Sequence, residues 1–281
     1  MSRFHIFAAS ALVITATLLL NSTAKASSVA QVQLQAGATA ATLDQNPVVS
    51  AVLSTPTTLN GVTTTRYIFL VDDGTGSMDV FGTANGTPPA NGGYNLPTGP
   101  TVGDALTISG TNSPFSGIPE LGSPTAITLN SSGNPHPAPL LETIPGMAGY
   151  TAQPPAGTPF PSFAGHLVTL DNVSISSATS GNYGAANVAV TLTDGSSNTM
   201  AGFYNPTTYA LANQDLFGTP IATGPVNATG LVQIFSGAPE LLLMSVTPVP
   251  EPSAFVLGGL SLMGLAIAWK ARYRSAPSLR T

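Results

Sequence analysis

The central part of the chain alternates short apolar runs with clusters of Gly, Asn, Pro and Ser, and it shows no helix-period pattern of any length. Apolar runs of this length that are bounded by turn-forming residues predict β-strands. The predicted strands are Val48–Leu53, Arg66–Val71, Met78–Phe81, Ala105–Ser109, Gly165–Ile175, Val188–Thr193, Met200–Tyr204, Gly230–Phe235 and Leu241–Val246. We therefore expect an all-β fold for this region.

The predicted strands form two blocks that look like copies of each other. In each block one strand enters an Asp-Gly turn, at Asp72–Gly76 and at Asp194–Asn198, and a second strand leaves it. This order is typical of a β-hairpin, in which Gly accepts a positive φ. A Pro-Glu-Leu tripeptide follows later in each block, at Pro119–Leu121 and Pro239–Leu241. The shared tripeptide fixes the register of the repeat.

A longer apolar run opens the chain. Arg3 provides a basic start, the run extends from Ile6 to Leu20, and the small-residue triplet Ala24-Lys25-Ala26 follows. This order is typical of a Sec-type signal peptide, with Ala24 and Ala26 as the cleavage-site residues and cleavage after Ala26. A retained N-terminal membrane anchor and a buried helix are the weaker alternatives. We expect the Sec machinery to export the protein.

The other end combines a Pro-Glu-Pro segment, an apolar run and a basic stop. Val249, Pro250, Glu251, Pro252 and Ser253 precede the run Ala254–Trp269, and Lys270, Arg272 and Arg274 follow it. The run is at the short limit for crossing a hydrocarbon core of about 30 Å. The cations after it place the last residues in the cytoplasm by the positive-inside rule. We therefore expect one C-terminal transmembrane helix that anchors the exported protein, with a buried helix of a soluble domain as the weaker alternative.

This order of motif, apolar helix and basic stop resembles the PEP-CTERM sorting signal of Gram-negative bacteria. The resemblance implies that an exosortase, a membrane enzyme, cuts near the Pro-Glu-Pro segment during delivery to the cell surface or the exopolysaccharide matrix. Pro250 and Pro252 keep the segment extended, because Pro fixes φ and restrains the residue before it. One departure from the usual pattern is that Ser275–Thr281 continues beyond the basic residues.

The region between the two ends resembles OB-fold modules, which often occur in pairs beside exported bacterial nucleases and phosphoesterases. The segments that carry this resemblance are YIFLVDDGTGSMDVFG, VGDALTISG, FAGHLVTLDNVSI and VTLTDGSSNTMAGFY. The resemblance implies two tandem OB-like five-stranded barrels. A β-sandwich is the alternative, because strand spacing alone does not separate a sandwich from a small barrel.

These features divide the chain into five parts. We expect a signal peptide at 1–26, a first OB-like domain at 27–130, a Pro-rich connector at 131–162, a second OB-like domain at 163–247 and the sorting tail with its transmembrane helix at 248–281. The connector contains eight prolines. This density predicts a stiff and partly extended segment.

Charge excludes one class of partner for the exported part. Between Ser27 and Thr247, eleven carboxylates face a single cation, Arg66, which gives a formal charge of minus ten. Nucleic-acid-binding surfaces need several Lys or Arg contacts to phosphate. We therefore expect no nucleic-acid partner, although OB-folds often bind single strands. The chain has no Cys, which excludes disulfides, thiolate metal sites and Cys nucleophiles.

The histidines offer little for catalysis. His136 lies in the connector and His166 on a predicted strand, and no G-x-S-x-G elbow accompanies either residue. A Ser-His-Asp arrangement would need one of them as its base. The sequence therefore argues against this route.

Carboxylates cluster around the first Asp-Gly turn. Asp72, Asp73 and Asp79 could supply oxygens to a Ca²⁺ loop, but their spacing does not fit an EF-hand. A hairpin whose first Asp bonds its own turn explains them better. Glu120 and Glu240 occupy equivalent repeat positions, which favours a structural role for both.

We expect a non-catalytic surface or matrix protein that needs no cofactor or metal and is sorted by an exosortase. An extracellular carbohydrate-binding module, with the exopolysaccharide as partner, is the alternative, because aromatic, Asn, Ser and Thr side chains suit polysaccharide surfaces. The Asn- and Gly-rich segment Thr83–Pro100 is long enough for recognition, although a passive loop explains it as well. A cryptic hydrolase is the more distant alternative.

Overall fold

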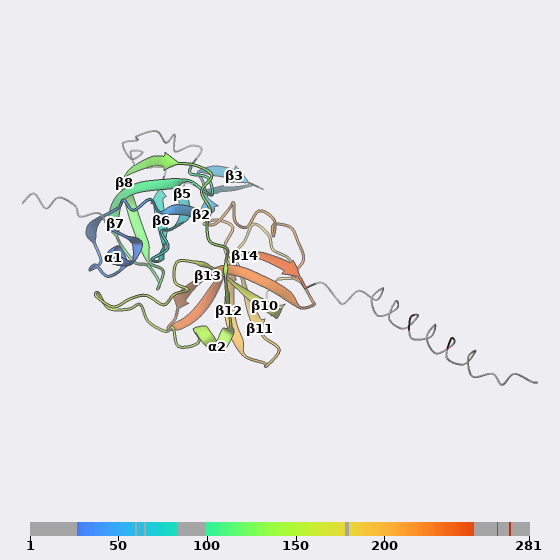
Figure 1. Ribbon diagram of the computed structural model, residues 1–281. Coiled ribbons are helices and arrows are strands. Elements are labelled where there is room, and N and C mark those ends of the chain that lie inside the picture. Colours follow the sequence, from blue (N-terminus) through green and yellow to red (C-terminus); the bar gives the residue numbers. More distant parts are fainter. Residues whose placement is uncertain are drawn as a thin grey trace, which may run out of the picture.

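The computed structural model describes residues 27–59, 61–64, 66–83, 99–177, 180–249, 263 and 270 (Figure 1). Strands dominate this part of the chain, in which the helices α1 (Val29–Gln33) and α2 (Ile144–Met147) are a turn or so long. The prediction of an all-β fold is confirmed.

Five strands in the first half of the chain close into a ring, which we call the N-terminal barrel. They are β2 (Val48–Ser54), β5 (Arg66–Asp72), β6 (Ser77–Thr83), β7 (Ala105–Asn112) and β8 (Glu120–Ser131). Their order is β7-β2-β5-β6-β8, and the pairing of β8 with β7 closes the ring. The β6–β8 pair is parallel, whereas the other pairs of the ring are antiparallel. β1 (Thr39–Leu43) pairs with β7, and β3 (Thr57–Leu59) pairs with β4 (Val62–Thr64) in a separate hairpin.

The second half of the chain repeats this strand plan in what we call the C-terminal sheet. Its strands are β9 (Leu140–Glu142), β10 (Leu167–Ser176), β11 (Val188–Thr193), β12 (Thr199–Tyr204), β13 (Val226–Phe235) and β14 (Ala238–Pro248). The order is β11-β12-β14-β13-β10-β9, and β10 also pairs with β11. Here β12 and β14 form the parallel pair that corresponds to β6 and β8. In Figure 1 the C-terminal sheet, in yellow and orange, lies against the blue and green N-terminal barrel.

The burial pattern of the strands follows from their alternating side chains. In β11, Val188, Val190 and Leu192 are buried, whereas the two residues between them are exposed. This alternation is expected for a strand with one face on a core. β5 is instead buried on both faces from Tyr67 to Asp72. Phe69 faces the interior of the N-terminal barrel, while Leu70 packs in a cluster that reaches the C-terminal sheet. β5 therefore lies in the middle of the molecule.

An apolar cluster joins the two halves. It contains Ala51, Leu53, Ile68, Leu70 and Ile118 from the N-terminal barrel and Leu231, Leu242 and Met244 from the C-terminal sheet. All of these side chains are at least nine-tenths buried. The burial of apolar surface on this scale favours a fixed arrangement of the two halves.

Polar contacts add to this interface at one edge. Ser77 Oγ donates to the Gly165 carbonyl oxygen at 2.8 Å, and His166 Nε2 lies 3.4 Å from Asp72 Oδ2. Gly165 has φ +80°, and a Cβ at this position would collide with the Ser77 backbone. Glycine is therefore required here for the close approach of the two chain segments.

The predicted hairpin at the first Asp-Gly turn is present between β5 and β6. Asp72 Oδ1 accepts from the Gly74 N–H at 2.7 Å, and Asp73 Oδ1 accepts from the Thr75 N–H at 2.9 Å. Gly74 takes φ +80°. These two carboxylates are thus occupied by their own turn, as expected for Asp in this position.

Three features differ from the sequence predictions. α1 and β1 were not predicted, yet Val29 and Leu43 contribute to the core of the N-terminal barrel. The connector is more structured than its prolines suggest, because it contains β9 and α2 and buries Met147 and Tyr150 against the C-terminal sheet. His166 precedes β10 instead of lying on it.

The terminal predictions fall mostly outside the described residues. This applies to the signal peptide at 1–26 and to the transmembrane helix at 254–269, of which only Met263 is described. Among the described residues, no helix has the length and apolar character needed to cross a membrane.

Candidate functional site

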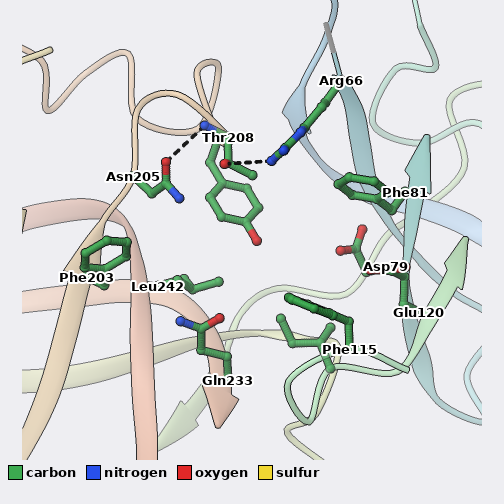
Figure 2. A pocket seen from close by; sticks show the side chains of 12 residues that line it. Arg66, Asp79, Phe81, Phe115, Glu120, Phe203, Asn205, Thr208, Gln233 and Leu242 are labelled. Carbon is green, nitrogen blue, oxygen red and sulfur yellow. Dashed lines mark hydrogen bonds between the residues drawn. The ribbon is translucent and has the colours of Figure 1, made fainter. Parts of the chain in front are cut away.

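A cavity of about 360 Å³ lies between the N-terminal barrel and the C-terminal sheet (Figure 2). Its volume is at the lower end of the range for small-molecule sites, about 300–1,000 Å³. Its walls are Arg66, Asp79, Phe81, Phe115, Ile118 and Glu120 from the first half and Phe203, Asn205, Thr208, Tyr209, Gln233 and Leu242 from the second. The packing of the two halves therefore creates this cavity.

Two carboxylates lie side by side in its wall. The parallel pairing of β6 with β8 places Asp79 in register with Glu120. The neighbours of Asp79 on β6, Met78 and Val80, fill the barrel interior. Because side chains alternate along a strand, Asp79 faces away from the barrel interior, and Figure 2 shows its carboxylate pointing into the cavity.

Asp79 is a buried acid that lacks a complete set of donors. Its side chain is 3% exposed, and its Oδ1 atom is buried without a hydrogen-bond partner in the described part of the chain. Burial and the charge of Glu120 raise the pKa of Asp79 well above its usual value, against a smaller opposing effect of the Val80 N–H. An unsatisfied buried acceptor costs about 1–3 kcal/mol. A ligand that supplies a donor would recover this cost.

Glu120 is the more accessible member of the pair. Its Oε1 accepts from Ser113 Oγ at 3.1 Å. Burial raises the pKa of Glu120 to about 6, and the bond from Ser113 offsets only part of this effect. Glu120 is therefore mostly ionised at neutral pH, so the pair carries negative charge.

The cation of the cavity bridges the two halves. Arg66 Nη1 donates to Thr208 Oγ1 at 3.0 Å, and the guanidinium carbon lies 5.6 Å from the centre of the Phe81 ring. The Thr208 N–H donates in turn to Asn205 Oδ1 at 3.1 Å, and Figure 2 shows both bonds. These contacts tie β5 to the loop that follows β12.

Aromatic rings supply most of the remaining surface. Phe81 and Phe203 come from the corresponding strands β6 and β12, and Phe115, which is 65% exposed, comes from the loop between β7 and β8. Tyr209 also lines the cavity. Burial raises its pKa, and the nearby charges of Asp79 and Glu120 add to this effect while Arg66 opposes it.

Gln233 adds an amide whose orientation is fixed. Its Nε2 donates to Glu240 Oε2 at 2.6 Å. The cavity thus combines rings, amides, a hydroxyl and a carboxylate pair, and apolar walls with a few oriented polar groups are typical of small-molecule sites. In the described residues, His, Cys, Asp and Glu side chains nowhere gather in threes as a metal site would need.

The structure separates the acidic residues that the sequence grouped. Asp72 and Asp73 lie in the hairpin turn, whereas Asp79 lies on β6 in the cavity wall. Within the described residues they do not form a Ca²⁺ loop. The sequence predicted only a structural role for Glu120, whereas in the structure Glu120 also lines the cavity.

The structure brings His166 and Asp72 together. Ser77, a serine of the same interface, is 1% exposed, and its hydroxyl bonds to the carbonyl oxygens of Val71 and Gly165. Burial lowers the pKa of His166, against the opposing charge of Asp72. His136 is exposed in the connector.

A comparison of the two repeats could have identified Asp79 as a candidate site residue, because the second repeat has Ala201 at the same position. Ser77-Met78-Asp79-Val80-Phe81 corresponds to Thr199-Met200-Ala201-Gly202-Phe203, and the strand pairings place Asp79 opposite Glu120 and Ala201 opposite Glu240. The carboxylate at this position therefore belongs to one copy alone.

Of the site residues predicted at the two ends of the chain, the structure describes Val249 and Lys270. Val249 follows β14, where its N–H donates to the Pro225 carbonyl at 3.1 Å, and Lys270 is exposed. The other residues, Ala24, Ala26, Pro250, Glu251, Pro252, Ser253, Arg272 and Arg274, lie outside the described residues.

Comparisons with known proteins locate one feature. No curated protein matches this chain. A solved structure described as "Molecular basis for abrogation of activation of pro-inflammatory cytokines" aligns with 75% of this chain and 94% of its own, at 13% identity and a TM-score of 0.35. A likeness this weak does not establish a shared fold. The family described as the PEP-CTERM protein-sorting motif matches residues 248–272. The chain thus carries, from the last residue of β14 onward, the signal of an exported protein that an exosortase sorts to the cell surface.

Proposed function

We propose that this chain is a non-catalytic protein of the cell surface or the exopolysaccharide matrix, which displays two OB-like barrels there. The observation that carries this proposal is the PEP-CTERM motif at residues 248–272. The Sec machinery exports the chain, and an exosortase cuts near Glu251 and releases the folded part to its destination.

The strand order supports the OB-like assignment. When only the five strands of each ring are numbered along the chain, leaving out β1, β3, β4 and β9, both rings follow the order 1-2-3-5-4. Strand 4 lies next to strand 1, and strand 3 is parallel to strand 5. This is the plan of the five-stranded Greek-key barrel called the OB-fold. A sandwich of two separate sheets would not pair β8 with β7 across the ring of the N-terminal barrel.

The positions of the acidic residues support a non-catalytic role. Glycosidases place two carboxyl groups on opposite sides of the scissile bond, whereas Asp79 and Glu120 come from adjacent strands in one wall. The Ser77 hydroxyl, which could otherwise serve as a nucleophile, is directed to two carbonyl groups. Neither arrangement activates a nucleophile.

The intact mass of the exported protein, measured in cells with and without their exosortase, tests the sorting proposal. We expect a mature form that begins near Ser27 and ends near Pro252 in the first strain, located at the surface or in the matrix. In the second strain we expect the longer form in the membrane fraction. The variant Glu251→Gln should reproduce the defect, while the exposed-site control Asp215→Asn should be processed normally.

A single form that retains residues 254–281 in both strains would contradict sorting by exosortase. It would leave a plain membrane-anchored protein. A screen of full-length protein for hydrolysis of polysaccharides and esters, with and without added divalent metals, tests the non-catalytic part. Turnover that Asp79→Asn or Glu120→Gln abolishes would overturn it.

A second candidate function is carbohydrate binding, which the cavity between the two halves favours. Aromatic walls, the amide of Gln233 and the carboxylate pair suit a ligand with apolar ring faces and many hydroxyl groups. OB barrels bind oligosaccharides as well as oligonucleotides. A glycan array probed with the full chain tests this candidate, and the absence of any bound glycan would refute it.

A further inference from the structure

The cavity between the two halves presents negative charge at its polar wall. Asp79 and Glu120 are adjacent there, with a buried Oδ1 on Asp79 that accepts no hydrogen bond in the described part of the chain. Two like charges on neighbouring strands oppose each other's ionisation. A cationic group placed between them would remove this repulsion and supply the missing donor.

The groups that face this pair determine which cation fits. Glu120 faces Asp79 from β8, Tyr209 faces both from the loop after β12, and Arg66 approaches from β5. Arg66 donates to Thr208 and lies over Phe81. Tyr209 stays protonated and uncharged because its pKa is raised. Glu120, whose pKa is about 6, gives the pair its negative charge near neutral pH.

The rest of the cavity indicates what carries the cation. Phe81, Phe203 and Phe115 offer ring faces, and Gln233 offers an amide held by Glu240. A volume of about 360 Å³ admits a small ring system and excludes a folded peptide segment. A compact ring that has hydroxyl groups and one amine matches these walls.

Other ligand classes fit less well. An anion would meet the two carboxylates, and like charges at short range are repulsive. A divalent metal would find only two acidic ligands here, and the described residues gather no third. A neutral sugar could donate hydrogen bonds to Asp79 but would leave the charge of the pair uncompensated.

We propose that this cavity binds an amino sugar, with the protonated amine between Asp79 and Glu120 and the ring against Phe81 and Phe203. The inference rests on the carbohydrate-binding candidate and is independent of sorting by the exosortase. The source of the amino sugar is either a free monosaccharide or a unit of a partly deacetylated polysaccharide, which share the same chemistry.

Calorimetric titration of the full chain in detergent with matched sugars tests this inference. The probes are a trisaccharide of β-1,4-linked glucosamine, its fully N-acetylated form, the corresponding glucose trisaccharide, and glucosamine itself. We expect the amine trisaccharide to bind at least tenfold more tightly than the other two trisaccharides near pH 7. Equal binding of glucosamine would indicate the free sugar as the source, whereas binding of the trisaccharide alone would indicate the polymer, and both outcomes support the proposal.

Variants locate the binding to the carboxylate pair. Asp79→Asn and Glu120→Gln keep the shape of each side chain and remove its charge, so each should weaken the amine trisaccharide at least tenfold. Asp215→Asn removes an exposed charge outside the cavity and should bind as the parent protein does. Thermal unfolding of each variant shows whether it folds, and loss of binding by a folded variant identifies a role in recognition.

Acidification provides a second readout. The affinity for the amine trisaccharide should fall between pH 7 and pH 5, because Glu120 gains a proton in this interval. The Glu120→Gln variant should lose most of this dependence.

Three results would overturn the amino-sugar inference. They are equal affinity for the amine and N-acetylated trisaccharides, unchanged binding by both carboxylate variants, and no binding of any amine probe. Equal binding of all three trisaccharides at the cavity would leave carbohydrate binding intact. Absence of all sugar binding would remove that candidate too.

Discussion

The N-terminal barrel and the C-terminal sheet share one strand plan, but the third strand carries an acid in the first half and none in the second. The parallel pairs place Asp79 opposite Glu120 in the first half and Ala201 opposite Glu240 in the second. Asp79 is buried in the wall of the cavity, while Ala201 is exposed. The same backbone position therefore holds an acid where the two halves meet and a small side chain where the strand faces solvent.

The two glutamates show what the repeat conserves between its copies. Glu120 accepts from Ser113 and Glu240 accepts from Gln233, and each donor lies seven residues earlier. Both bonds join the end of the fourth strand to the start of the fifth. The repeated glutamate therefore has a structural role in each half, and the departure from the repeat, Asp79, points to function.

The largest expected effect concerns a glycine that both halves have next to a β-bulge. Gly230 and Gly110 lie at shifts in the β13–β14 and β7–β8 registers. A Cβ on Gly230 would overlap the Leu242 carbonyl oxygen, whereas a Cβ on Gly110 would lie 3.0 Å from the Gly122 carbonyl oxygen. We expect Gly230→Ala to lower the free energy of unfolding by about 3 kcal/mol and Gly110→Ala by about 1 kcal/mol.

Urea unfolding of the two glycine variants measures this difference. The control is Gly149→Ala, which adds a Cβ in open space at an ordinary φ. Gly133→Ala would not serve, because Gly133 has a positive φ that disfavours any side chain. Equal losses for Gly230→Ala and Gly110→Ala would show that the two bulges tolerate a side chain equally well.

The second effect concerns what Asp79 contributes to the stability of the fold, as distinct from its proposed role in ligand binding. Its pKa is higher in the folded protein than the ordinary value of 3.8, so its contribution to stability is present at acidic pH and is lost as the pH rises through the folded-state pKa. We expect Asp79→Asn to raise the free energy of unfolding by on the order of 1–2 kcal/mol at pH 8 and by less at pH 4. Chemical unfolding at the two pH values measures it, and a destabilised variant at pH 8 would contradict the expectation.

The third effect compares the repeated glutamates. The pKa of Glu120 rises from 4.5 to about 6 on folding, so stability should fall as the pH rises from 4.5 through 6. A shift of this size corresponds to about 2 kcal/mol, which the partial exposure of Glu120 reduces to about 1 kcal/mol. Glu120→Gln should make this slope smaller in a series of unfolding curves between pH 4 and pH 7.

Glu240→Gln is the matched variant for the C-terminal sheet. Burial raises the pKa of Glu240 as well, against the bond from Gln233. We expect a slope of the same sign to remain in Glu120→Gln and to become smaller again in the double variant, in which Asp79 keeps its raised pKa. A flat profile in the parent protein would show that neither glutamate titrates differently on folding.

The smallest effect is expected from copying the acid into the second half. Ala201→Asp places a carboxylate on an exposed position of β12, where solvent keeps it ionised at little cost. The free energy of unfolding should change by no more than about 0.5 kcal/mol, and affinity for the amine trisaccharide should not rise. A new binding event in the calorimeter would show that burial between the two halves is not what gives Asp79 its role.

Local features of the fold were predictable from the sequence, whereas contacts between distant segments were not. The hairpin between β5 and β6 followed from Asp72–Gly76, because turn residues act on their immediate neighbours. The core positions of Val29 and Met147 could not be predicted, since they fill spaces that distant strands create.

The candidate site was predictable in part. Arg66 was noted as the single cation of the exported part and Glu120 was given a structural role, but neither was assigned to a site, because the sequence does not show which faces of the two halves meet. Asp79 was assigned to the turn on account of Asp72 and Asp73 nearby in the chain. The alternation of β6 separates it from them and directs it to the cavity.

The position of β14 has a mechanical consequence. This strand ends at Pro248, and the match to the sorting motif begins at the same residue. β14 pairs along ten residues with β13 and in parallel with β12. Before the exosortase cuts, the chain is held by its C-terminal tail, and a polymer bound in the cavity would put tension along the axis of β14. The hydrogen bonds on both sides of that strand would then be loaded together in shear, and would not be opened one at a time.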